Sequence, residues 1–199
     1  VLYHAALTLG TGSGVMVTGS HNPPEFNGFK MMVDSHTLHG KDITNLYEMM
    51  TQSKLEIGEG SITTADALTP YIDQIIGDIH LEKPLKVSID CGNGVAGVCA
   101  QSLFEQLGCE IIPLFTEVDG TFPNHHPDPS KPENLADVIG SVLSEKCDLG
   151  LAFDGDGDRV GLITETGHSI FADRLMMLLS RDVLSRNTGA TIIYDVKCS

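Results

Sequence analysis

The sequence is poor in positive charge. Its 199 residues include 12 lysines and arginines against 27 aspartates and glutamates, which gives a formal net charge of -15. The few basic residues form no cluster of the kind that neutralises the phosphates of nucleic acid. We therefore expect neither nucleic acid nor an anionic membrane surface as a partner.

Long apolar runs are also missing. No stretch approaches the roughly 20 apolar residues that cross a bilayer, and the first residues do not resemble a secretion signal. The five cysteines include no Cys-x-x-Cys pair, so reduced thiols in a cytoplasmic protein are the simplest interpretation. Because the chain starts with Val1 and stops in an expected strand, we expect it to be a piece of a longer protein.

The apolar residues that are present follow two periods. Short β-branched runs alternate with longer amphipathic segments, which predicts an α/β fold with mixed sheets flanked by helices. The expected strands are residues 14–18, 29–33, 85–90, 109–115, 148–153, 160–164 and 190–196. The expected helices are residues 42–50, 67–79, 95–107, 133–145 and 172–184.

Two breaks in this pattern mark expected domain boundaries. Residues 55–66 are polar, contain glycine and lack periodicity. A second boundary falls near Gly167, where a new helix and strand follow a hairpin. The expected domains are residues 1–66, 67–167 and 168–199.

Residues 153–159 read FDGDGDR and connect two expected strands. The two glycines let the backbone curl, so that Asp154, Asp156 and Asp158 can converge. Carboxylates this close raise one another's pKa unless a cation lies among them. Oxygen ligands without nearby histidine or cysteine select Mg²⁺ or Ca²⁺. A solvated acidic turn is the alternative, but turns seldom need three carboxylates.

The residues around this loop bear on the choice of cation. Glu165 stands at the twelfth position counted from Asp154, as in an EF-hand loop. Arg159, however, stands where that loop needs glycine, and the flanking segments have strand patterns. An arginine here suits bidentate contact with phosphate, which Mg²⁺ often shares as a ligand. The pattern favours Mg²⁺ acting on a phosphoryl group and leaves a Ca²⁺-binding module as an alternative.

A second polar loop, residues 18–28, also connects two expected strands. Prolines stiffen it, and Gly19 lets the backbone approach a ligand. Ser20 on such a rigid tip can be a covalent nucleophile if His21 or Lys30 lies near it. Taken alone, however, such a loop is better explained as an ordinary polar turn.

A third pattern points elsewhere. Gly92, Gly94 and Gly97 satisfy G-x-G-x-x-G after an expected strand, and Glu117 follows about 20 residues later. Alone, this pattern would nominate a dinucleotide-binding domain. A tight strand-to-helix connection with close packing needs the same glycines, and the presence of a metal-suited loop and a serine loop in the same chain favours that structural interpretation.

The motifs together resemble a known family. T-G-S-H-N-P at residues 18–23 and D-G-D-G-D-R at residues 154–159 are similar, in this order, to the α-D-phosphohexomutases. CGNGVAG at 91–97 and VDGTFPNHHPDP at 118–129 also resemble that family. The resemblance covers essentially the whole chain. Because such enzymes have four domains, it implies the end of the first domain, all of the second and the start of the third.

The resemblance also implies roles for individual residues. Ser20 would be the phosphoserine, and its phosphate would contact a Mg²⁺ ion that three aspartates bind. The metal-binding residues are then Ser20, Asp154, Asp156 and Asp158. The other catalytic positions fall on Lys30 as general acid and base, with His21 and Arg159 in support, and Lys197 matches a substrate-binding lysine.

The implied reaction moves phosphate between the 1- and 6-positions of glucose or mannose. Its partners are hexose phosphates and hexose 1,6-bisphosphate. In this family the sugar-contacting loop belongs to the third domain and the distal phosphate is bound by the fourth. Activity is therefore expected to need parts beyond these 199 residues.

Overall fold

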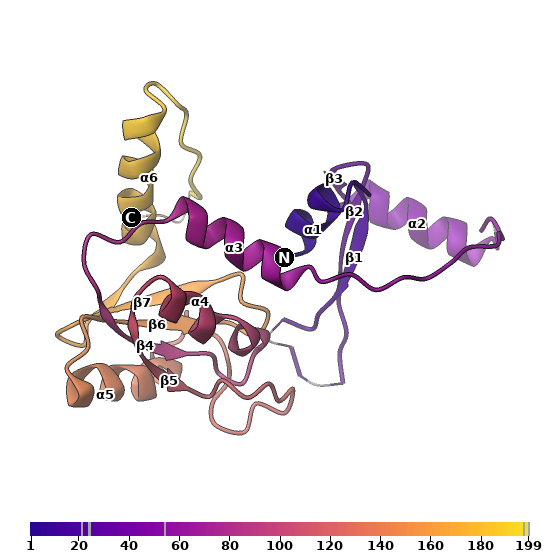
Figure 1. The fold of residues 1–199 in the computed structure, drawn as a ribbon. Helices are drawn as coiled ribbons and strands as arrows, with labels where there is room; N and C mark the ends of the chain where they lie inside the picture. Colours follow the sequence, from indigo (N-terminus) through magenta and orange to yellow (C-terminus); the bar gives the residue numbers. More distant parts are fainter. Residues whose placement is uncertain (21, 24, 54, 197, 199) are drawn as a thin grey trace. The chain divides into compact units, whose positions relative to one another are not determined.

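The computed structural model describes residues 1–20, 22–23, 25–53, 55–196 and 198. They divide into two compact units, Val1–His80 and Leu81–Ser199 (Figure 1). Each unit contains a sheet with helices, which confirms the expected mixed α/β fold. The division into three domains at residues 66 and 167 stays a prediction.

The first unit contains a small antiparallel sheet in the order β1-β2-β3. Helix α1 packs against β1, where a Cβ added to Gly14 would lie 2.9 Å from the Leu2 side chain. The strands are β1 (Gly14–Val17), β2 (Phe29–Val33) and β3 (His36–Thr37), and the helices are α1 (Leu2–Thr8), α2 (Lys41–Thr51) and α3 (Leu68–Asp78).

The second unit is built on a five-stranded sheet in the order β5-β4-β6-β7-β8. The first three strands in this order are parallel, and β7 and β8 continue the sheet antiparallel. The strands are β4 (Lys86–Asp90), β5 (Glu110–Leu114), β6 (Leu149–Phe153), β7 (Val160–Thr164) and β8 (Ser169–Ile170). The helical segments are η1 (Val95–Val98), α4 (Ala100–Gln106), η2 (Pro132–Leu135), α5 (Ala136–Glu145) and α6 (Ala172–Arg186).

Strand β4 is buried on both faces, as expected for a central parallel strand. Val87 and Ile89 point into one core cluster, together with Ala100 of α4. The opposite face packs on α5, whose Val138 and Val142 are fully buried. Figure 1 shows α4 and α5 on opposite faces of the sheet. The sheet is therefore the middle layer of an α/β/α arrangement.

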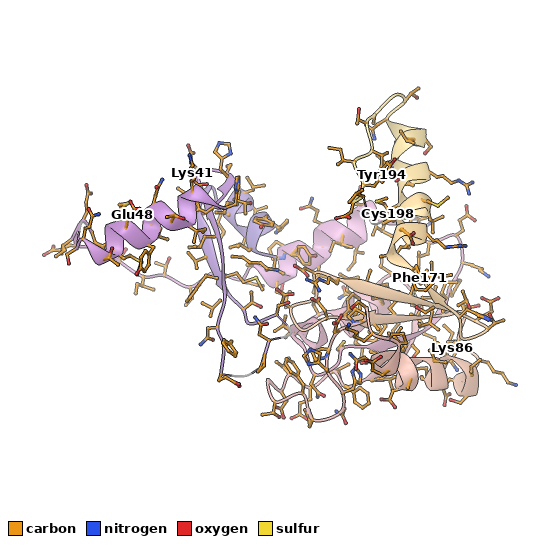
Figure 2. The ribbon with its side chains drawn as sticks, turned by 180° about the vertical axis from the view of Figure 1, so that it is seen from behind. Lys41, Glu48, Lys86, Phe171, Tyr194 and Cys198 are labelled. Atoms are coloured by element: carbon orange, nitrogen blue, oxygen red, sulfur yellow. The ribbon has the colours of Figure 1, made fainter. Side chains whose placement is uncertain are left out.

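Charged side chains join the starts of the parallel strands. The Lys86 ammonium lies 3.2 Å from the Glu110 carboxylate and 3.9 Å from that of Glu145, and Figure 2 labels Lys86 among the side chains. The backbone N–H of Lys86 donates to the Asp148 carboxylate at 2.8 Å. Because these groups are partly exposed, the ion pairs add little stability, but they help to fix the strand register.

Six of the seven expected strands form within one residue of their expected ends. The expected strand at 190–196 is wrong, because the structure describes this segment as irregular chain. Its N–H and C=O groups have no adjacent strand in the described sheets, and a strand needs one. Helix α1 and the two-residue strands β3 and β8 were not expected. Among the residues described, no helix has the length and apolar character needed to cross a bilayer.

Substitution of Gly97, which lies in η1 just before α4, tests how closely this helical segment packs against the chain after β5. A Cβ added to Gly97 would lie 2.0 Å from the carbonyl oxygen of Thr116, which follows β5. We expect Gly97→Ala to lower the free energy of unfolding by about 3 kcal/mol, because backbone must move to admit the methyl group. Urea denaturation measures this loss.

Gly140→Ala is the matched control, because nothing lies within 4 Å of the added Cβ on this helical glycine. It should raise the stability by up to about 1 kcal/mol through helix propensity. Equal effects of the two substitutions would contradict the packing argument.

Candidate functional site

Three loops follow the carboxyl ends of the parallel strands β4, β5 and β6. They are residues 91–94, 115–131 and 154–159. Because the strands are parallel, these ends meet at one edge of the sheet, the usual position of ligand sites in α/β folds. The candidate site of the second unit is built at this edge.

The third of these loops, residues 154–159, is the turn between β6 and β7, and we call it the metal loop. The Asp154 N–H donates to the Arg159 carbonyl at 3.2 Å, and the Arg159 N–H donates to the Asp154 carboxylate at 3.0 Å. Gly157 adopts φ +71°, a conformation that favours glycine. The loop is thus closed at its base and curled, as its sequence predicted.

The three carboxylates of the metal loop converge. One oxygen from each of Asp154, Asp156 and Asp158 lies within 4.8 Å of the others. Asp154 is fully buried, and burial, with the charges of Asp156 and Asp158, raises its pKa. A hard cation bound by these oxygens would remove that cost. The residues therefore fit a divalent oxygen-binding ion such as Mg²⁺.

Arg159 lies beside this acidic cluster. Its Nε atom is 3.9 Å from an oxygen of Asp154 and 3.9 Å from an oxygen of Asp158. These distances are too long for hydrogen bonds. The side chain is 56% exposed, so the guanidinium can reach an anion that approaches the loop.

Glu165 does not share in the cluster. It follows the last residue of β7, whereas the metal loop precedes the first, and a five-residue strand spans roughly 17 Å. The flanking elements are strands of one hairpin rather than helices. The hairpin that carries the metal loop therefore lacks the helix–loop–helix arrangement of an EF-hand. A hard cation at this loop would be bound without Glu165 as its twelfth-position ligand.

The glycine turn, residues 91–94, packs directly against the metal loop. The Val95 N–H donates to the Gly155 carbonyl at 3.0 Å. A Cβ added to Gly94 would lie 2.8 Å from the same oxygen and 3.1 Å from the Asp154 carbonyl. Together with the close approach at Gly97, this explains the G-x-G-x-x-G spacing by backbone packing and supports its structural interpretation.

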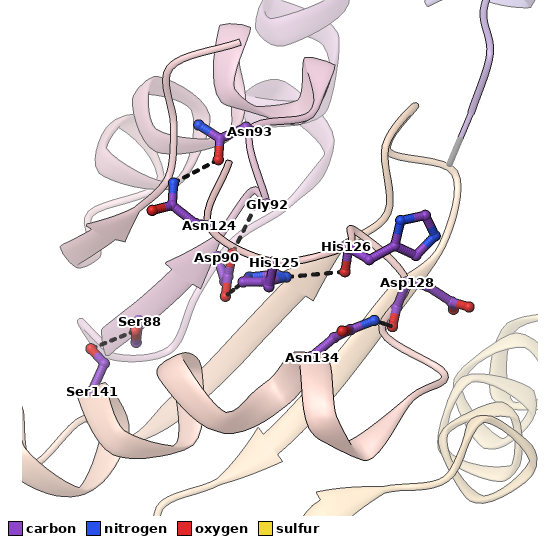
Figure 3. A network of polar contacts seen from close by, with 10 residues as sticks. All are labelled: Ser88, Asp90, Gly92, Asn93, Asn124, His125, His126, Asp128, Asn134 and Ser141. Atoms are coloured by element: carbon purple, nitrogen blue, oxygen red, sulfur yellow. Dashed lines mark hydrogen bonds and ion pairs between the residues drawn. The ribbon is translucent and has the colours of Figure 1, made fainter. Parts of the chain in front are cut away.

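An ion pair between the partly buried His125 and the buried Asp90 lies on the other side of the glycine turn (Figure 3). His125 Nε2 donates to the Asp90 carboxylate at 3.0 Å, and its Nδ1 lies 3.0 Å from the His126 carbonyl oxygen. Both partners are acceptors, so only a doubly protonated imidazole satisfies both contacts. The hydrogen bond to Asp90 accordingly raises the pKa of His125 to about 9. His125 is thus a partly buried cation at neutral pH.

The serine loop, residues 18–28, is held in the first unit between β1 and β2. The Thr18 N–H donates to the Gly28 carbonyl at 2.9 Å, and the Thr18 side chain accepts the Ser20 N–H at 2.9 Å. A Cβ added to Gly28 would lie 2.4 Å from the Thr18 carbonyl oxygen. Ser20 has φ 51°, which is strained for serine. Such strain is typical of functional positions.

The structure describes only some of the remaining predicted site residues. Lys30 stands in β2 opposite Met16 of β1, two residues beyond the end of the serine loop. Its role as acid and base stays a prediction, as do the roles of Ser20 and Arg159. His21 and Lys197 lie outside the described residues.

Neither Asp90 nor His125 was predicted as a site residue, although His125 lies in the motif at residues 118–129. They are 35 residues apart, and no local pattern connects them. One signal was present: Asp90 ends a buried strand at the carboxyl edge of the sheet, where polar residues are commonly functional.

A mixed sheet with a three-carboxylate loop at the carboxyl ends of its parallel strands defines an α/β protein whose loop fits a hard cation. Comparison with known proteins narrows this class. Residues 69–167 match the model of phosphoglucomutase/phosphomannomutase alpha/beta/alpha domain II, and residues 1–56 match that of domain I. The chain belongs to the phosphoglucomutase/phosphomannomutase family, which confirms the resemblance found in the sequence.

Individual relatives agree. The chain is 59% identical over its whole length to the phosphomannomutase/phosphoglucomutase of Pseudomonas aeruginosa and 50% identical to a phosphoglucomutase of Neisseria gonorrhoeae over 99% of its length. It spans 43% of the length of each. A crystal structure of a family protein from Burkholderia thailandensis, 52% identical, matches with a TM-score of 0.91 over 94% of this chain and 41% of that one.

The metal loop predicts a cation-dependent stability. We expect Mg²⁺ to raise the melting temperature of the chain. At a Mg²⁺ concentration 100 times the Kd, binding should stabilise the folded state by about 2.7 kcal/mol. The effect should be weakest at acid pH, where the raised pKa of Asp154 keeps that carboxyl protonated. Asp154→Asn should abolish it. Glu165→Gln is the control and should leave it unchanged; loss of the effect in that variant would revive the twelve-residue calcium loop.

The ion pair between Asp90 and His125 should make the free energy of unfolding fall as the pH rises. The folded-state pKa of His125 is about 9, whereas unfolded histidine titrates near 6.5. The pair therefore contributes fully below about pH 6.5, and its contribution, at most on the order of 3 kcal/mol, is lost as the pH rises through 9. Urea denaturation at pH 6, 7.5 and 9 measures the fall.

Asp90→Asn is the matched control for this pH dependence. The amide can donate to a neutral imidazole at Nε2 while Nδ1–H still donates to His126. Histidine then gains no proton affinity on folding, and the extra fall should disappear. The same fall in both proteins would assign it to other titrating groups.

Proposed function

We propose that the chain carries the serine loop and the metal loop of a phosphohexomutase. The whole enzyme would interconvert hexose 1-phosphate and hexose 6-phosphate, of glucose or mannose, through hexose 1,6-bisphosphate. The observation that supports this most strongly is the convergence of three carboxylates, one fully buried, in a chain that also holds a strained serine on a closed loop. The names of the relatives support the choice of sugars.

Ser20 is the proposed phosphoryl carrier. In the first step the bond between the serine oxygen and phosphorus breaks, and a bond forms between phosphorus and the free hydroxyl oxygen of the bound sugar phosphate. Lys30, on the strand that leaves the serine loop, is the proposed group that takes up the hydroxyl proton. The bisphosphate then turns end for end, the Ser20 oxygen takes the other phosphoryl group, and Lys30 gives the proton back to the sugar oxygen that this group leaves.

The metal loop has the complementary part. Asp154, Asp156 and Asp158, with the serine phosphate, would hold Mg²⁺, which when bound offsets negative charge on the transferring group. Arg159 adds donors for the phosphate oxygens. Such transfer needs little covalent work, so positioning and charge supply most of the acceleration. His21 and Lys197 keep the supporting and substrate-binding roles that the family resemblance implies.

The phosphoserine assignment has a direct test. The chain is incubated with glucose 1,6-bisphosphate, with and without Mg²⁺, and phosphate is located by mass spectrometry. We expect phosphate on Ser20, dependent on Mg²⁺ and absent from Ser20→Ala. Ser61→Ala, an exposed serine outside the helices and strands, should be labelled at Ser20 as the unchanged chain is.

Turnover is measured in a chimera in which this chain replaces the matching 43% of the Pseudomonas aeruginosa relative. Ser20→Ala should remove nearly all interconversion of glucose 1-phosphate and glucose 6-phosphate, because no other group carries the phosphoryl. Normal turnover in that variant would exclude Ser20 as the carrier.

A further inference from the structure

The network around His125 lies outside the predicted site, yet it is connected to the metal loop by an unbroken series of contacts. It begins at Asp90, the last residue of β4. One carboxylate oxygen accepts the Gly92 N–H at 2.8 Å, and the other accepts from His125 at 3.0 Å. The carboxylate is only 1% exposed. Asp90 thus joins the glycine turn to the loop that carries His125.

His125 is fixed from its other side as well. The His126 carbonyl that accepts from the imidazole also accepts the Asp128 N–H at 2.9 Å. The Asn134 amide in turn donates to the Asp128 carbonyl at 3.0 Å (Figure 3). The ring of Phe115 packs edge-on against the imidazole, with centroids 5.4 Å apart. The imidazole is therefore held in one orientation, and neighbouring residues pack against it.

The glycine turn fits against that surface without spare room. Gly92 has φ +50°, and an added Cβ would lie 2.9 Å from Pro127 and 3.3 Å from Cε1 of His125. Asn93 follows with φ 59°. Its side-chain amide donates to the Glu117 carbonyl at 2.8 Å, and its side-chain oxygen accepts from Asn124 at 2.7 Å. Two residues in left-handed backbone are thus held by the loop after β5.

The opposite side of the turn meets the metal loop. Gly94 and Val95 contact the backbone of Gly155, which lies between the first two proposed ligands. Ala96 lies within 3.4 Å of a Cβ added to Gly157, between the second and third. A shift of the turn would therefore shift the backbone that separates the three carboxylates.

We propose that Asp90 and His125 are positioning residues for the metal loop: their hydrogen bonds hold the glycine turn where it supports Gly155, and thereby set how tightly the loop binds a divalent cation. This inference rests on the proposed metal-binding role of Asp154, Asp156 and Asp158. Residues that orient metal ligands from behind commonly change metal affinity 10- to 100-fold.

The test uses Mn²⁺ as the probe, because it accepts the same oxygen ligands and is seen by electron paramagnetic resonance. Free Mn²⁺ gives the Kd, and the spectrum of the bound ion at saturation reports the ligand geometry. His125→Ala removes both imidazole contacts, and we expect the Kd to rise roughly tenfold and the bound spectrum to broaden.

Two variants separate positioning from a general loss of stability. Ser88 is buried in the same strand β4, and Ser88→Ala removes its hydrogen bond of 2.8 Å to Ser141 of α5, which does not involve the glycine turn (Figure 3). It should lower the melting temperature yet leave the Kd within twofold. Asp90→Asn should also keep the Kd within threefold, because the amide and a neutral imidazole can preserve both hydrogen bonds.

A third variant changes a later contact in the same series, the one between the glycine turn and the metal loop. Gly94→Ala pushes directly on the Gly155 carbonyl and should weaken Mn²⁺ binding as much as His125→Ala. Because both act through one turn, the double variant should lose less than the sum of the two effects. If His125→Ala does not fold, His125→Asn, which keeps a donor for the His126 carbonyl and loses the one for Asp90, gives the same decision.

The outcomes are distinct. An unchanged Kd in His125→Ala overturns this inference while the metal site stands, as does a tenfold loss in Ser88→Ala or an equal loss in Asp90→Asn. If the unchanged chain binds no Mn²⁺, or if Asp156→Asn binds as well as the unchanged chain, the proposed metal site itself fails and the inference fails with it.

Discussion

The close approach of two backbones, Gly94 in the turn after β4 and Gly155 in the loop after β6, is the constraint on which the second unit depends. A Cβ at Gly94 would lie 2.8 Å from the Gly155 carbonyl oxygen, which is too close for a side chain. This contact holds the metal loop in place against the glycine turn. Without it, repulsion among the three carboxylates would open the loop. Burial of Asp154 follows from it, and the raised pKa of that carboxyl is the electrostatic cost.

The two candidate loops reach a defined shape by different means. In the metal loop the left-handed position falls on Gly157, where it costs little. In the serine loop it falls on Ser20, where it costs about 1 kcal/mol or more. The hydrogen bonds of Thr18 at the base of the loop offset that cost.

Periodicity was enough to predict most of the fold, because β-branched runs and amphipathic helices record which faces are buried. It failed at residues 190–196, since strand propensity says nothing about whether a partner strand is adjacent. It also missed β3 and β8, which are too short to show a period. Among site residues, Asp154, Asp156 and Asp158 were predictable because their spacing alone brings them together. Asp90 and His125 were not, because only the sheet topology makes them neighbours.

The same difference between local and distant contacts has a consequence for folding kinetics. The three aspartates lie within one β-hairpin, and hairpins close in roughly 1–10 μs. The glycine turn reaches the metal loop only after β4 pairs with β6, which lies about 60 residues further along the chain. A divalent cation present during synthesis or refolding therefore meets the carboxylates before their support is in place. Until the glycine turn docks, repulsion among the three carboxylates opposes the curl of the loop, so the docking of the surroundings is the slow step in forming this site.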